Sequence, residues 1–142
     1  MPRYDSETRT RTLARIIGPY LIAMAVMVFV RHASLLMLFP AFMENGPLVL
    51  ATGAFALMAG LAVVGVHHHW RGAAAIAISL VGVIAALKGA ALMIVPELGA
   101  QISAGLAGAP TFMLVVAALV LVVGLWLSVV GWNRRAAEPV AG

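Results

Sequence analysis

The sequence predicts an all-α membrane protein with four transmembrane helices, arranged as two similar tandem hairpins. Of its 142 residues, 63% are apolar and only 10% are charged, and the mean hydropathy is +1.07. A soluble domain is about 45–50% apolar and about 25% charged, so this chain cannot cover a globule with polar surface. It has no cysteine, which excludes a disulfide-stapled secreted module.

Four apolar segments are long enough to cross the membrane, because about 30 Å of hydrocarbon needs roughly 20 helical residues. They lack the period-2 alternation of β-barrel strands, and a single strand cannot satisfy its backbone in lipid. We predict spans at 13–30, 47–66, 72–95 and 110–132, within a transmembrane domain over 13–132 that lies between tails at 1–12 and 133–142.

The first span has only 15 uncharged residues, Ile16 to Val30, which is also the length of a signal-peptide core. No small-x-small cleavage site precedes Arg31 and His32, and removal would leave an odd number of spans. We therefore predict an uncleaved membrane helix.

The distribution of basic residues predicts the orientation. Only Arg31 falls in a loop on one side of the membrane, whereas seven arginines share the other side. Because the positive side is cytoplasmic, we expect both termini and the 67–71 connection in the cytoplasm. The seven are Arg3, Arg9, Arg11, Arg15, Arg71, Arg134 and Arg135.

The second and fourth spans have similar ends. Each begins with a proline, Pro47 or Pro110, and each ends with a tryptophan that has an arginine one or two residues after it. Proline at a helix start loses no hydrogen bond, and tryptophan favours the headgroup level. The expected interfacial anchors are Trp70, Arg71, Trp132 and Arg134.

The segments at 31–46 and 96–109 are too short to span and too apolar for free loops. Leu98, Ile102 and Leu106 recur every four residues, which is typical of a short helix lying in the interface. The chain thus consists of two tandem units of helix, outer segment and helix. Duplication and parallel physical constraint both explain this similarity.

Lys88 is the one charge inside a predicted span other than the first. It lies eight residues before Pro96, or about 12 Å below the helix end. Its long stem can snorkel to the outer interface and pair there with Glu44 or Glu97. The alternative is that Lys88 binds or moves an anion, since charges within the membrane are often functional.

Three consecutive histidines follow the second span, and His67 and His69 share a side only if the chain is extended. Helical metal ligands are spaced three or four residues apart, so we expect polar anchoring here, with a weak metal site as the alternative. No other metal site and no cofactor is predicted.

Small residues recur at spacings of three and four on three spans, which lets helix backbones approach closely in lipid. We expect them to pack within one four-helix bundle, and an external dimer face is the alternative. They are Gly53, Ala56 and Gly60 on the second span, Gly82, Ala85, Ala86, Gly89 and Ala90 on the third, and Gly124 and Ser128 on the fourth.

Several short motifs resemble those of a group of small uncharacterised bacterial inner-membrane proteins with four helices. They are Ala62 to Trp70, where the group has His-Asn-x-Trp; Ala86-Leu87-Lys88-Gly89; Met93 to Glu97; and Gly18-Pro19-Tyr20. The likeness covers most of 13–132, but His68 stands where the group has asparagine. The resemblance implies a bacterial inner-membrane location and no established activity.

No nucleophile–base pair, carboxylate pair or phosphate loop appears, so we predict that the protein is not an enzyme. The net charge is +4, but the basic residues flank apolar runs, so the expected partners are membrane lipids rather than nucleic acid. We expect an accessory membrane component, acting by helix packing as a homo-oligomer or in a larger membrane complex. The alternative is a small oligomeric transporter or channel in which Lys88 attracts an anion.

Overall fold

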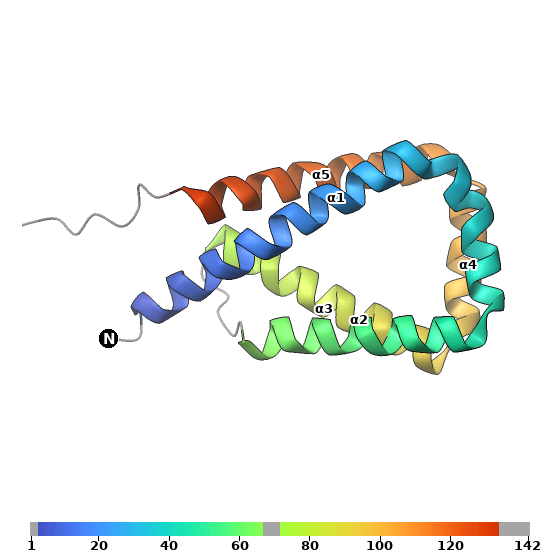
Figure 1. The fold of residues 1–142 in the computed structure, drawn as a ribbon, viewed down its shortest axis with the longest axis horizontal. Helices are drawn as coiled ribbons and strands as arrows, with labels where there is room; N and C mark the ends of the chain where they lie inside the picture. The colour runs from blue at the N-terminus through green and yellow to red at the C-terminus, as the bar shows by residue number, and fades with distance from the viewer. Residues whose placement is uncertain (1–2, 67–71, 134–142) are drawn as a thin grey trace, which may run out of the picture.

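The computed structural model describes residues 3–66 and 72–133, which form five helices and no strand (Figure 1). All but α4 are long and apolar enough to cross a membrane, which confirms the all-α membrane fold. The bounds of α2, α3 and α5 lie within one residue of the predicted spans. The helices are α1 (Arg3–Glu44), α2 (Gly46–Val66), α3 (Ala73–Ile94), α4 (Pro96–Ala107) and α5 (Pro110–Trp132).

Helix α1 is longer than the predicted first span, because it begins at Arg3 and continues through the first outer segment. Its one non-helical residue is Arg31, with φ −117° and ψ 15°. We call residues 32–44, beyond this break, the distal arm of α1. The ring of His32 lies beside the break, with Nδ1 3.2 Å from the carbonyl oxygen of Phe29. Both outer segments are therefore helical, the first as the distal arm and the second as α4.

The helix starts follow from local chemistry. Asn45 caps α2, since its side-chain oxygen accepts a hydrogen bond of 3.2 Å from the backbone N–H of Leu48. Gly72 precedes α3 with φ of 100°, a conformation that glycine adopts without steric cost. Pro110 occupies the first turn of α5, where a missing N–H costs no hydrogen bond.

The helices pack as two pairs, α1 with α5 and α2 with α3 (Figure 1). Each pair takes one helix from each tandem unit, so the two legs of a predicted hairpin have only slight contact with each other. The physical reason is the outer segment between them: α4 has 12 residues, about 18 Å of helix, and it separates the legs that it joins. The hairpins are therefore open, and close packing occurs between the units.

The two helix pairs contain equivalent glycine contacts, made by residues that are 64 positions apart in the chain. A Cβ built on Gly60 would meet the backbone of Ala86 and the carbonyl oxygen of Gly82. A Cβ built on Gly124 would lie 3.0 Å from the backbone nitrogen of Ile22 and 3.0 Å from the carbonyl oxygen of Gly18. Gly60 and Gly124, Gly82 and Gly18, and Ala86 and Ile22 are each separated by 64 residues. A shift of 64 residue numbers therefore relates α1 to α3 and α2 to α5.

The pairs converge at the end where α1 begins and α5 ends, which we call the termini end, and they diverge toward α4 (Figure 1). A buried cluster joins them at the termini end, with Ala14 and Ile17 from α1, Ile78 from α3 and Leu127 from α5. At the opposite end, the α4 end, the distal arm and α4 connect the separated pairs.

Candidate functional site

A cavity of about 810 Å³ lies at the α4 end, and we call it the chamber. Its wall includes residues of α1, α2, α3 and α4, and it is partly open. Ligand sites in proteins are commonly about 300–1,000 Å³ and mostly apolar with a few polar groups, and the chamber matches this description. It is therefore the candidate binding site of the molecule.

The distal arm and α4 supply one apolar side of the chamber. Leu98, Gly99 and Ile102 of α4 line it, so two of the apolar positions that predicted an interfacial helix also border the cavity. Gly99 lies close to its neighbours, because a Cβ there would be 3.1 Å from Cε of Met43 and 3.1 Å from Cδ2 of Leu92. The distal arm adds Leu35, Leu38, Phe39, Phe42 and Met43.

Helices α2 and α3 supply the other side, including the polar groups. The α3 residues are Ile84, Leu87, Lys88, Ala91 and Leu92, and α2 contributes Thr52. Among all lining residues Lys88 is the one with a charge, and Thr52 carries the one hydroxyl. The chamber is therefore an apolar space with a single ammonium group on its wall.

Lys88 has no salt bridge in the part of the chain that the structure describes, which includes Glu44 and Glu97. The ion pair with Glu44 or Glu97 considered from the sequence is therefore absent from this structure. An unpaired cation within a membrane is costly, and an anion or water in the chamber can lower this cost. Lys88 thus lies where it can contact a ligand.

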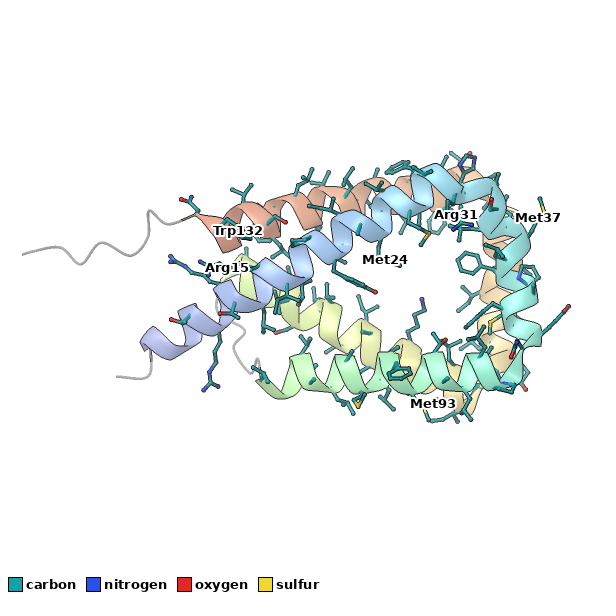
Figure 2. All side chains as sticks on the ribbon, viewed as in Figure 1. Arg15, Met24, Arg31, Met37, Met93 and Trp132 are labelled. Carbon is teal, nitrogen blue, oxygen red and sulfur yellow. The ribbon has the colours of Figure 1, made fainter. Side chains whose placement is uncertain are left out.

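At the termini end, Arg15 and Trp132 lie together (Figure 2). The guanidinium carbon of Arg15 is 5.8 Å from the centre of the Trp132 ring, within the range of a cation–π interaction. The Arg15 Nε–H also donates a 2.7 Å hydrogen bond to the carbonyl oxygen of Gly131, one of the carbonyls left unpaired at a helix C-terminus. Trp132, which the sequence predicts as an interfacial anchor, is exposed. Its ring contacts Arg15 of α1.

Other predicted site residues lie outside the described ranges. These are His67, His69, Trp70, Arg71 and Arg134. Within the described ranges, no group of three or more His, Cys, Asp or Glu side chains is arranged to hold a metal ion.

The predicted small residues lie where helices meet. Gly53, Gly60, Gly82 and Gly89 are buried between α2 and α3, and Gly124 is buried against α1. Ser128 also lies in the α1–α5 contact, with its Oγ 2.5 Å from the position of a Cβ on Gly18. This confirms packing within the bundle for these positions.

Sequence reasoning missed most of the chamber lining. The signal was present in the distal arm, where Leu35, Leu38, Phe39, Phe42 and Met43 recur at spacings of three and four, the pattern of one helix face. The pattern indicates an apolar face but not what that face covers, because a lipid surface and a cavity select the same side chains.

Comparison with known proteins adds no relative. The sequence matches no known family profile, and no curated protein and no solved structure is significantly similar to it.

Proposed function

We propose that the protein is a non-enzymatic accessory component of the bacterial inner membrane that holds a lipophilic ligand in the chamber. The observation that carries this proposal is the cavity of about 810 Å³ with an almost wholly apolar wall. A site of this size and polarity suits a ligand drawn from the bilayer. The absence of a paired nucleophile and base in the sequence is the reason for assigning binding rather than catalysis.

The proposed orientation places the termini end in the cytoplasm and the chamber in the outer half of the bilayer. The arginine distribution supports it, and the motif resemblance supports the bacterial inner membrane as the location. We further propose that the two tandem units arose by duplication, a view supported by the matching glycine contacts 64 positions apart.

A photoreactive, uncharged long-chain alcohol tests the proposal. Incubated with the purified protein in mixed micelles and then irradiated, a diazirine-bearing alcohol is expected to label the distal arm and α4, as located by peptide mass spectrometry. Gly99→Leu should reduce this labelling about tenfold, because its side chain enters a space already bounded by Met43 and Leu92.

Gly105→Leu is the matched control on the same helix, because a Cβ on Gly105 would meet nothing within 4 Å. It should label as the wild type does. Labelling spread evenly over the lipid-facing surfaces, and unchanged in Gly99→Leu, would show that the chamber holds no lipophilic ligand.

The second candidate function is an anion pathway that uses Lys88 within an oligomer. One observation favours it, namely that Lys88 lines the chamber without an ion pair in the described chain. The binding function is preferred because the buried cluster at the termini end lies between the chamber and that side of the membrane.

A further inference from the structure

The chamber wall combines one cation with an apolar surface, and we propose that its ligand is a long-chain carboxylate, an amphiphile with one chain and one negative charge. The carboxylate lies at Lys88, and the hydrocarbon chain lies against the distal arm and α4. This inference rests on the proposed binding function and names the class of ligand.

The position of Lys88 supports an anionic headgroup. The residue lies six residues before the end of α3 at Ile94, or about 9 Å below it, in a region where a charge needs a partner. No carboxylate of the described chain forms an ion pair with it, so its ammonium group is available to an anion from outside these residues. Thr52 supplies a hydroxyl on the same chamber wall, which suits a carboxylate with two accepting oxygens.

The remaining lining supports a hydrocarbon chain. Phe39 and Leu38 of the distal arm, together with Leu98 and Ile102 of α4, present only apolar side chains. Each methylene group moved into such a surface is favoured over water by about 0.8 kcal/mol, but the bilayer offers the same gain. The apolar lining therefore admits the chain, and Lys88 provides the preference over the surrounding lipid.

The depth of Lys88 favours a single-chain carboxylate over a two-chain phospholipid. A phospholipid keeps its phosphate at the headgroup level, above the depth of Lys88. The distal arm and α4 lie across the ends of the helix pairs there (Figure 1), between the headgroup level and the chamber. A carboxylate with one chain is small enough to lie beneath these two segments.

Met24 provides an internal comparison for Lys88, because it occupies the position 64 residues earlier in the chain. Figure 2 shows Met24 on the middle of α1, on the side turned toward the other helix pair. The two equivalent positions thus carry one ammonium group and one thioether. Lys88, and not Met24, lines the chamber, so the lining offers one cation, and a ligand with one negative charge matches it.

The test compares two photoreactive probes that differ only in the headgroup, a sixteen-carbon carboxylate and the corresponding alcohol, each bearing a diazirine in the chain. In neutral detergent at pH 8, we expect the carboxylate probe to label the chamber of the protein about tenfold more strongly than the alcohol probe. This ratio corresponds to the affinity gained from one charge-assisted hydrogen bond. Lys88→Met and Lys88→Gln should lower the carboxylate to the level of the alcohol, whereas Lys88→Arg should retain the preference. Circular dichroism and size-exclusion chromatography identify which variants fold.

Competition distinguishes the lipid classes. Unlabelled palmitate should displace the carboxylate probe, and phosphatidylglycerol at the same concentration should not. Equal labelling by the two probes in the wild type, a preference that persists in Lys88→Gln, or displacement by phosphatidylglycerol alone would each overturn the inference. Chamber labelling by the alcohol would still support the proposed function in those cases, and its loss would reject that function separately.

Discussion

Gly60 and Gly124 set the distances between paired helices, because each has a hydrogen where other residues carry a side chain. A Cβ at Gly60 would overlap the backbone of α3, and one at Gly124 would press on the backbone of α1. Lipid gives no hydrophobic drive for helix association, so stability depends on close van der Waals packing. These glycines therefore contribute more to the fold than an average residue of the spans.

Gly60→Val is expected to destabilise the protein by about 1–3 kcal/mol, the usual cost of overpacking, since the neighbour is backbone that cannot rotate away. Gly65→Val on the same helix is the matched control, because a Cβ there meets nothing within 4 Å. Unfolding by a rising fraction of sodium dodecyl sulfate, followed by circular dichroism, measures both variants. Equal midpoints for the two variants would contradict the assigned α2–α3 contact.

At the scale of elements, the outer segments decide which helices become neighbours. Sequence periodicity predicted the apolar stripe on α4 and the bounds of three spans, because both depend on local composition and on the thickness of the bilayer. It did not predict that the distal arm and α4 hold the legs of each unit apart. That result depends on the length of each outer helix relative to the width of a helix pair.

Disulfide formation tests the pairing directly, since the chain has no cysteine of its own. We expect Leu21→Cys with Gly124→Cys to cross-link, because the Leu21 Cβ lies 3.0 Å from the position of a Cβ on Gly124. A shift of about 0.5 Å between the helices brings these atoms into the range of about 3.5–4.5 Å that disulfides need. Leu21→Cys with Ala59→Cys, which would join α1 to an exposed position of α2, should stay reduced. Maleimide–polyethylene glycol gel shifts report the free thiols, and the reverse pattern would favour closed hairpins.

At the scale of the whole molecule, the two pairs meet at the termini end and separate toward α4, so the buried cluster and the chamber lie at opposite ends of the described helices. Ile78 and Leu127 are fully buried there, and close-packed side chains of this kind leave few voids within the chain. This shape, partly open at the α4 end and packed at the termini end, supports the proposed binding function over the anion pathway.

Proteoliposomes test this shape. We expect vesicles with wild-type protein to pass chloride no faster than empty vesicles, and Lys88→Met to change nothing, as followed by a chloride-sensitive dye under an imposed gradient. Wild-type flux that disappears in Lys88→Met would instead establish the anion pathway, and flux that survives the substitution would exclude Lys88 from it.

The sequence by itself determined the membrane as solvent, the number of long apolar helices and the presence of a lone charge at Lys88, because each depends on composition and on distance along the chain. The tertiary structure decided that α1 pairs with α5, that Arg15 contacts Trp132, and that Lys88 and Phe39 line one cavity. These contacts join residues far apart in the chain, and they depend on how the backbones fit together at glycines such as Gly60. In lipid, the same apolar residue types suit a neighbouring helix, a cavity and the bilayer. Only the packing of the helices therefore distinguishes these three surroundings.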